Sequence, residues 1–220
     1  MKIVAVLQTR YNSTRLPGKA CVDVNGLPLL WHVYRRLLAC KELDEVCVAV
    51  GCSDADPIID VCDKYGMHWM VGEEKNLLTR IIDAAVWCNA DAVLRVRADC
   101  LFLDPNVLDF MVRDFKALWP IVSGVSNWPR RYCSEGLDAE VVSMETLIAL
   151  DKDAFCPRED FATYAITKGI VSIHERQSMG GEDLHMSIDT EEDRVHAEQV
   201  LKRIGNDEFR YRTAVENWNV

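Results

Sequence analysis

The chain has 220 residues, of which 49% are hydrophobic and 27% are charged, and its formal net charge at pH 7 is −10. A chain of this length and composition can bury a substantial core, so we expect a single globular domain over residues 1–220. Nucleic-acid-binding surfaces are usually basic, so the acidic balance argues against a nucleic-acid partner.

Neither a membrane segment nor a metal-binding cysteine pattern is present in the sequence. Its apolar runs are too short to span a bilayer, and the N-terminus lacks the pattern of a signal peptide, so we expect a cytoplasmic protein with no membrane partner. The nine cysteines form no CxxC pair and no Cys/His cluster at zinc spacing. Most lie in apolar segments, as Cys47 and Cys88 do, and we interpret them as buried free thiols.

The first half of the chain alternates short apolar runs with segments of helical periodicity. The runs predict strands at 3–7, 46–50, 67–71 and 91–96, and the periodic segments predict helices at 29–38, 53–65, 77–88 and 105–115. This alternation is typical of βαβ crossovers. We therefore predict an α/β fold with a mostly parallel, Rossmann-like sheet sandwiched by helices.

The second half of the chain is less regular. It predicts a strand at 121–125, an arginine-bearing loop at 127–134, an exposed or edge strand at 136–142, helices at 145–150, 158–167 and 190–204, a strand at 170–174 that pairs away from the main sheet, and a strand end at 186–189. We interpret the irregular stretch of about 127–173 as a small arm, or as a region for the acceptor or for dimerisation.

The first strand opens into a basic loop that carries Arg10, Arg15 and Lys19. Guanidinium groups bind phosphate oxygens bidentately, lysine adds a mobile point charge, and Gly18 allows a ligand to approach the backbone. Ligands of parallel sheets bind beyond the carboxyl ends of the strands, where this loop lies. The loop therefore predicts a polyphosphate site, and the alternative is a solvated basic loop.

Two acids, Asp99 and Asp189, follow apolar segments far apart in the chain. Carboxylates brought together from two strand ends can hold Mg²⁺, which prefers oxygen ligands and keeps substrate phosphate in its shell. The alternatives are a turn residue for Asp99 and a helix N-cap for Asp189, with Thr190 competing for the cap.

Three common site motifs are absent from the sequence. Gly18-Lys19 is not a P-loop, because no glycine lies five residues before Gly18 and Ala20 replaces the serine or threonine that binds magnesium. The first strand is not followed by GxGxxG, and there is no GxSxG nucleophile elbow.

The opening loop from Gln8 to Lys19, with Asn25-Gly26 and Pro28 behind it, resembles the N-terminal signature of cytidylyltransferases that activate acidic sugars. That family includes the 3-deoxy-manno-octulosonate and acylneuraminate cytidylyltransferases. Farther along, the chain is most similar to the spore-coat polysaccharide (SpsF-like) branch. Five segments carry this likeness: Gly72–Arg80, Arg95–Pro105, Gly136–Val141, Arg158–Asp160 and Ser187–Asp193.

The resemblance implies a homodimeric enzyme that transfers CMP from CTP to a sugar-like, acidic acceptor with Mg²⁺, releases pyrophosphate and serves surface polysaccharide synthesis. It implies catalytic roles for Arg10, Arg15, Lys19 and Asp99, and Mg²⁺ ligation by Asp99 and Asp189. It implies nucleotide contacts from Gln8, Thr9, Arg10, Ser13, Arg15, Gly18, Lys19, Arg80 and Arg97. It implies acceptor contacts from Gly136, Leu137, Asp138 and Glu140.

The chain departs from the family pattern at two places, which puts the acceptor in question more than the reaction. Arg97-Ala98-Asp99-Cys100-Leu101 stands where the family usually has Thr-Gly-Asp-Cys-Pro, and Arg158-Glu159-Asp160 replaces a typical Arg-Glu-His. Trp128, in the arginine-bearing loop, is a candidate for stacking on a ligand.

Three other functions stay open on the sequence alone. One is a nucleotide-sugar-dependent glycosyltransferase, which needs a DxD pair at a strand end; Asp54-Ala55-Asp56 has that spacing but opens a predicted helix. Another is a nucleotidyltransferase that uses a different base or a non-sugar acceptor. The last is a non-catalytic relative that binds nucleotide.

Overall fold

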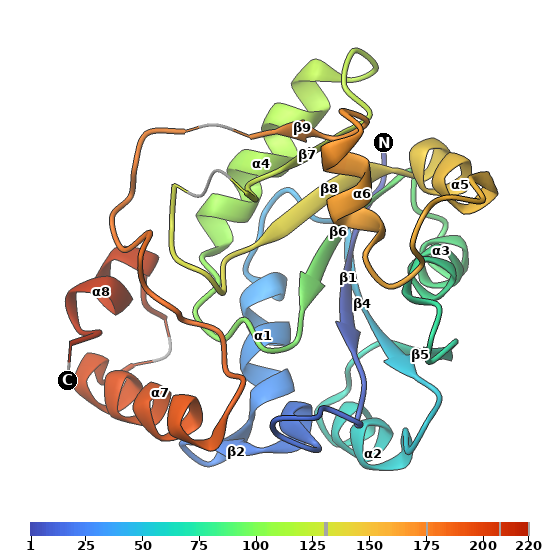
Figure 1. Ribbon diagram of the computed structural model, residues 1–220. Helices are drawn as coiled ribbons and strands as arrows, with labels where there is room; N and C mark the ends of the chain where they lie inside the picture. Colours follow the sequence, from blue (N-terminus) through green and yellow to red (C-terminus); the bar gives the residue numbers. More distant parts are fainter. Residues whose placement is uncertain (130–131, 175, 207, 220) are drawn as a thin grey trace.

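The computed structural model describes residues 1–129, 132–174, 176–206 and 208–219 (Figure 1). Its central layer is a seven-stranded sheet in the order β5-β4-β1-β6-β8-β7-β9. The strands are β1 (Ile3–Thr9), β4 (Glu45–Gly51), β5 (Trp69–Gly72), β6 (Ala92–Arg97), β7 (Gly124–Ser126), β8 (Ala139–Ser143) and β9 (Ser172–Ile173). A separate hairpin joins β2 (Asp23–Val24) to β3 (Leu27–Pro28) around the Asn25-Gly26 turn.

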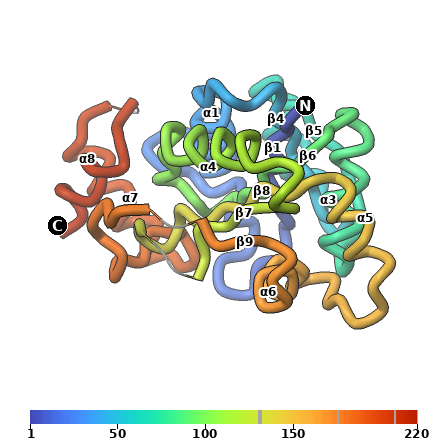
Figure 2. Tube along the Cα trace, turned by 90° about the horizontal axis from the view of Figure 1, so that it is seen from above, coloured from blue at the N-terminus to red at the C-terminus, as the bar shows by residue number. Residues whose placement is uncertain are grey.

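The described helices cover both faces of the sheet. They are the 3-10 helix η1 (Lys19–Cys21) and α1 (Leu29–Leu38), α2 (Asp56–Tyr65), α3 (Leu77–Trp87), α4 (Pro105–Leu118), α5 (Met144–Lys152), α6 (Phe161–Thr167), α7 (Glu191–Ile204) and α8 (Tyr211–Glu216). One core packs α1, α2, α4, α7 and α8 against one face, and a second core packs α3, α5 and α6 against the other (Figure 2). The predicted α/β sandwich is confirmed.

The four strands β5, β4, β1 and β6 pair in parallel, as predicted from the alternation of strands and helices in the first half of the chain. Val4 and Val6 of β1 face the core under α3, whereas Ile3, Ala5 and Leu7 face the core under α1. Both faces of these strands are buried, which is why the strands appear in the sequence as continuous apolar runs.

The prediction of an exposed or edge strand at 136–142 is wrong. β8 lies between β6 and β7, antiparallel to both, and all five of its residues are buried. The polar residue that produced the alternation is Glu140, which pairs with Arg95 of β6 instead of facing solvent.

Two further expectations for the second half are wrong. The predicted strand at 170–174 shortens to β9, which pairs in parallel with β7 at the edge of the main sheet and forms no separate arm. Residues 186–189 are not a strand, and an isolated bridge between Glu135 and His185 lies beside them. The stretch 127–173 contributes β8, α5, α6 and β9 to the sheet and its helical cover, and its role as a region for the acceptor or for dimerisation stays a prediction.

The cysteines match the expectation of buried free thiols. All nine are free, and seven are buried. Burial raises the pKa of the Cys62 thiol to about 12, so this thiol stays protonated at neutral pH. Within the described residues, no helix is both long and apolar enough to cross a membrane.

Helix α8 has no counterpart among the predicted elements, yet it holds the C-terminal segment to the fold. Tyr211, at its start, is 0% exposed. The Tyr211 hydroxyl accepts a hydrogen bond from the Ser134 N–H at 2.7 Å and donates one to the Gly180 carbonyl at 2.6 Å, while the Tyr211 N–H donates to Asp104 Oδ2 at 2.8 Å. One tyrosine thus links α8, the start of α4 and the loop that precedes β8.

We expect Tyr211→Phe to lower the free energy of unfolding by about 1–3 kcal/mol, because it leaves a buried N–H and a part-buried carbonyl without the hydroxyl between them. Denaturant unfolding followed by circular dichroism measures the change. Tyr65→Phe is the matched control: Tyr65 stacks on Trp31, and its hydroxyl forms no hydrogen bond within the described residues. Equal stability of the two variants would contradict the role given to the Tyr211 hydroxyl.

Candidate functional site

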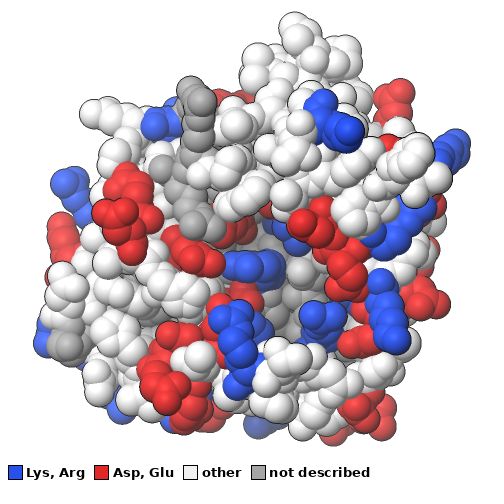
Figure 3. Space-filling view, in the orientation of Figure 1, with Lys and Arg blue, Asp and Glu red and all other residues white. Residues whose placement is uncertain are grey.

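A cleft of about 550 Å³ lies at the carboxyl ends of β1 and β6, on the face of the sheet that α3 and α6 cover. In Figure 3 it is a hollow near the middle of the molecule, edged by blue basic and red acidic side chains. Its lining is rich in charge and comprises Gln8, Thr9, Arg10, Ser13, Thr14, Arg15, Lys19, Leu77, Arg80, Arg95, Arg97, Ala98, Asp99, Trp128, Glu135, Asp138, Glu140, Glu159, Asp160, Ala162, Thr163 and Asp189.

The basic loop folds back on itself and presents its cations to this cleft. The Tyr11 carbonyl accepts hydrogen bonds from the Ser13 N–H at 2.9 Å and from the Gly18 N–H at 2.8 Å, which closes the loop. Gly18 has φ of 68°, and a Cβ there would lie 3.0 Å from the Tyr11 ring. Gly18 does not line the cleft. It allows the turn that brings Arg15 and Lys19 into the cleft, and the nucleotide contact expected of Gly18 stays a prediction.

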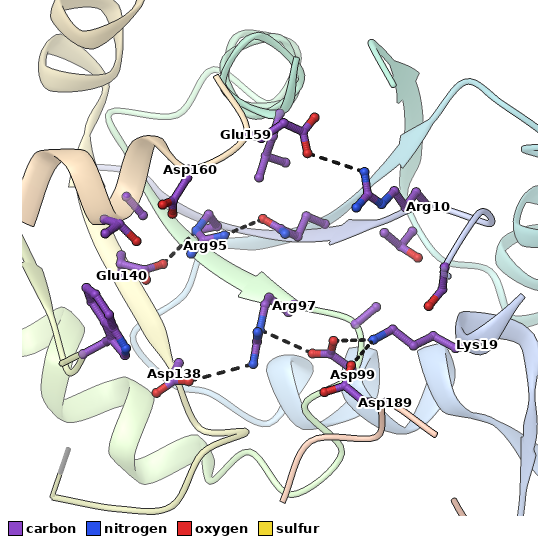
Figure 4. Close-up of a pocket in the computed structure, with 18 of the residues that line it drawn as sticks. Arg10, Lys19, Arg95, Arg97, Asp99, Asp138, Glu140, Glu159, Asp160 and Asp189 are labelled. Carbon is purple, nitrogen blue, oxygen red and sulfur yellow. Dashed lines mark hydrogen bonds and ion pairs between the residues drawn. The ribbon is translucent and has the colours of Figure 1, made fainter. Parts of the chain in front are cut away.

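The two predicted metal ligands, Asp99 and Asp189, meet at one end of the cleft, where both contact Lys19 (Figure 4). Lys19 Nζ lies 2.6 Å from Asp99 Oδ2 and 2.9 Å from Asp189 Oδ1. Arg15 Nη2 approaches the same Asp189 oxygen at 2.8 Å. The backbone fixes this meeting, because the Ile188 N–H donates to the Asp99 carbonyl at 3.0 Å.

The helix-cap alternative for Asp189 is wrong. Thr190 caps α7, and it forms a reciprocal capping box with Asp193. Asp193 also accepts a hydrogen bond from the Asp189 N–H at 3.0 Å. The Asp189 carboxylate is therefore left to face the cleft.

The donor set at Asp99 and Asp189 fits a magnesium ion. Asp99 is 7% exposed and Asp189 is 6% exposed, and their oxygens already converge on one cation, the Lys19 ammonium. Within the described residues, no group of three or more His, Cys, Asp and Glu side chains could hold a metal. Two carboxylates suffice for Mg²⁺ when substrate phosphate supplies further oxygens.

The floor of the cleft carries two arginine–carboxylate pairs between β6 and the start of β8. Arg95 Nε lies 2.7 Å from Glu140 Oε2, and Arg95 Nη1 donates to Gln8 Oε1 at 2.8 Å, so this pair is closed. Arg97 is held more loosely, with Nε 3.4 Å from Asp99 Oδ1 and Nη2 3.8 Å from Asp138 Oδ2. Nε and Nη2 of Arg97 are buried and have no hydrogen-bond partner within the described residues. The Arg97 side chain as a whole is 33% exposed and lines the cleft.

Most of the expected site residues line the cleft, but two acceptor residues do not. Leu137 is 0% exposed and belongs to the core. Gly136 has φ of 97°, and a Cβ there would lie 2.7 Å from the backbone of Met186 and Ser187. The buried Leu137 side chain does not face the cleft, and the acceptor contact expected of Gly136 stays a prediction for its backbone. Arg80 does line the cleft, and its Nη1 donates to the carbonyls of Glu73 and Glu74.

Several lining residues were not assigned to the site from the sequence. Arg95 could have been, because strand periodicity puts it on the same face of β6 as Arg97. Glu159 and Asp160 belong to the Arg158–Asp160 segment that carries the family likeness, but the likeness gave them no role in the site. Glu135 carries no local signal, since only the packing of the loop before β8 brings it to the cleft. Arg130 and Arg131, the arginines of the predicted loop at 127–134, lie outside the described residues.

The ion pair between Lys19 and Asp189 shifts the pKa of both groups. Burial alone would raise the pKa of the Asp189 carboxyl, but the hydrogen bond and charge of Lys19, with Arg15, outweigh burial and hold that pKa below its usual value. Burial alone would lower the pKa of the Lys19 ammonium, and the two aspartates outweigh it and raise that pKa.

A depressed pKa in the folded state stabilises the fold above the unfolded-state value of about 4, and this contribution is lost as the pH falls through the folded-state value. We therefore expect Asp189→Asn to lower the free energy of unfolding by about 2 kcal/mol at pH 7. The difference from wild type should shrink as the pH is lowered from about 5 to about 3. Denaturant unfolding at a series of pH values measures it. Asp160→Asn is the control, because exposed Asp160 forms no ion pair with the described residues. A pH-independent loss in Asp189→Asn would contradict the ion-pair account.

Known proteins match parts of this chain in sequence. A 3-deoxy-manno-octulosonate cytidylyltransferase of Geobacter metallireducens is 29% identical over 128 residues, which are 57% of this chain and 47% of the relative. The spore coat polysaccharide biosynthesis protein SpsF of Bacillus subtilis is 27% identical over 145 residues, which are 64% of this chain and 60% of the relative. The chain thus spans about half the length of the curated relatives it matches.

A solved structure of a cytidylyltransferase from Leptospira borgpetersenii superposes with a TM-score of 0.91 at 26% identity, covering 98% of this chain and 93% of that one. The family described as cytidylyltransferase matches residues 4–210. This match spans the basic loop, both aspartates and the whole sheet, and the chain therefore belongs to the cytidylyltransferase family.

Proposed function

We propose that this protein is a Mg²⁺-dependent cytidylyltransferase that transfers CMP from CTP to a sugar-like, acidic acceptor and releases pyrophosphate. We further propose that it works as a cytoplasmic homodimer in surface polysaccharide synthesis. One observation carries the proposal: the cations of the basic loop and the Asp99–Asp189 pair line the same cleft. Family membership supports CTP as the nucleotide, and the SpsF relative supports the pathway.

The cations of the basic loop suit the triphosphate. Arg10 and Arg15 are largely exposed, and Lys19 is nearly buried beside the aspartates. Arg10 pairs with Glu159 at 3.4 Å, and an exposed pair of this kind is weak enough to exchange for a phosphate oxygen. Three cations along one wall would neutralise the β- and γ-phosphates and stabilise the departing pyrophosphate.

Asp99 and Asp189 would hold the Mg²⁺. When bound, the ion would neutralise negative charge that develops on the transferring group. The remaining task of the protein is to position the acceptor and the nucleotide. The acceptor oxygen forms a bond to the α-phosphorus as the bond from that phosphorus to the pyrophosphate oxygen breaks, and this reaction needs alignment and charge stabilisation more than covalent help from the protein.

The acceptor would lie over the floor of β6 and the residues leading into β8. The Asp138 carboxylate can accept hydrogen bonds from sugar hydroxyls, and the exposed part of the Arg97 side chain can face an acidic group. Trp128, on the same wall, offers an aromatic face for a sugar ring. These contacts support a sugar-like, acidic acceptor.

The structure gives no support to the DxD alternative. Asp56 begins α2, and Asp54 accepts a hydrogen bond from Asn12 at 3.0 Å. Neither aspartate lines the cleft. A metal site built on this pair would lie apart from the basic loop's cations and from Asp99, so a glycosyltransferase of that kind is disfavoured.

We expect CTP with Mg²⁺ to raise the thermal stability of the protein more than UTP, GTP or ATP does. A ligand that binds the folded state at a hundred times its Kd adds about 2.7 kcal/mol of stability. A thermal-shift panel of the four nucleotides, each with and without Mg²⁺, measures the preference.

Asp99→Ala is the companion variant, and it should lose the Mg²⁺-dependent part of the shift and abolish pyrophosphate release. Equal shifts for all four nucleotides would sink the proposed specificity for CTP. A preference for a UDP-sugar or GDP-sugar would favour the glycosyltransferase instead.

A further inference from the structure

The ammonium of Lys19 lies where a metal ion shared by Asp99 and Asp189 would lie. In Figure 4 the lysine reaches across from the basic loop, and its nitrogen contacts an oxygen of each carboxylate. The Lys19 side chain is 17% exposed, so little water competes for the ammonium. The two aspartates therefore already share one cation.

The charges around the two aspartates oppose the entry of a second cation. Three cationic side chains touch the two carboxylates: Lys19 touches both, Arg15 touches Asp189 at 2.8 Å, and Arg97 approaches Asp99 at 3.4 Å. Arg97 also approaches the Asp138 carboxylate at 3.8 Å, so with ordinary ionisation three cations balance three carboxylates and leave no excess negative charge. A bare divalent ion would meet a neutral cluster in which the Lys19 ammonium already lies between the two aspartates, and like charges repel strongly in such a poorly hydrated site.

A triphosphate changes that balance. Its oxygens are strong acceptors for an ammonium, and lysine carries its charge on a flexible four-carbon stem. The Lys19 backbone is held in place, because its N–H donates to the Leu16 carbonyl at 3.1 Å at the start of η1. The side chain alone can therefore turn from the carboxylates to a phosphate while the loop keeps its shape.

We propose that Lys19 closes the metal position in the nucleotide-free protein, and that the divalent ion is taken up together with the triphosphate that draws the ammonium away. The identity of the triphosphate rests on the proposed function, but the competition between the Lys19 ammonium and a metal ion does not. The order of binding follows: the free protein binds divalent ions weakly, and the metal arrives with the nucleotide.

The test measures binding of Mn²⁺ alone, without nucleotide, from the electron paramagnetic resonance signal of the free ion. Lys19→Met keeps the length of the side chain and removes its charge. We expect this variant to bind Mn²⁺ at least about tenfold more tightly than the wild type. The double variant Lys19→Met/Asp99→Asn should lose that gain, which assigns the new site to the two aspartates.

Arg10→Met is the matched control. It removes a cation from the same cleft, but Arg10 pairs with Glu159 and not with either aspartate. It should leave Mn²⁺ affinity close to that of the wild type, whereas a general effect of net charge would move Arg10→Met and Lys19→Met together and overturn the proposal.

Wild-type protein that binds Mn²⁺ as tightly as Lys19→Met would also overturn it. If Lys19→Met does not fold, as judged by circular dichroism, Lys19→Gln takes its place with the same expected gain. The wild-type titration also stands alone, because a tight site abolished by Asp99→Asn would disprove the closure by Lys19. Failure of CTP to bind would count against the proposed function and would leave this result unaffected.

Discussion

The site depends on the parallel pairing of β1 with β6. This register sets Gln8 beside Arg97, and the Ala98 N–H donates to the Gln8 carbonyl at 3.2 Å, so the basic loop and the turn at Asp99 leave the sheet side by side. The backbone bond from Ile188 to Asp99 then adds the second carboxylate. Lys19 therefore meets Asp99 and Asp189, although the three residues lie far apart in the sequence, because these backbone contacts fix the segments that carry them.

Charge organises the cleft into two parts. At one end, Arg15 and Lys19 face the paired aspartates, an arrangement that suits a metal and phosphates. Along the floor, Arg95 and Glu140 form a closed pair, whereas Arg97 is held more loosely between Asp99 and Asp138. Arg97 is one of the residues that depart from the family pattern, and it lies on the part of the cleft proposed for the acceptor.

The strands of the first half, and the convergence of Asp99 and Asp189, could be predicted because buried parallel strands have a clear apolar signature and a known functional edge. The central position of β8 could not be predicted. Glu140 gives the segment the polar–apolar alternation of an exposed strand, and the sequence does not show that Arg95 on the neighbouring strand pairs with it. The assignment of Leu137 to the acceptor site was wrong for a related reason. The motif covers consecutive residues, but consecutive side chains of an extended segment point to opposite faces, and Leu137 packs in the core. Helix α8 was not predicted because it has only six residues and is held by contacts of Tyr211 with Ser134 and Gly180, which are distant in the sequence.

The most direct measurement is a crystal structure with CTP and Mn²⁺, read from the anomalous signal of the metal. The account predicts a peak between the carboxylates of Asp99 and Asp189, the triphosphate along the basic loop, and the Lys19 ammonium on a phosphate oxygen. A metal bound elsewhere would contradict the account, and so would a nucleotide bound while Lys19 still bridges the two aspartates.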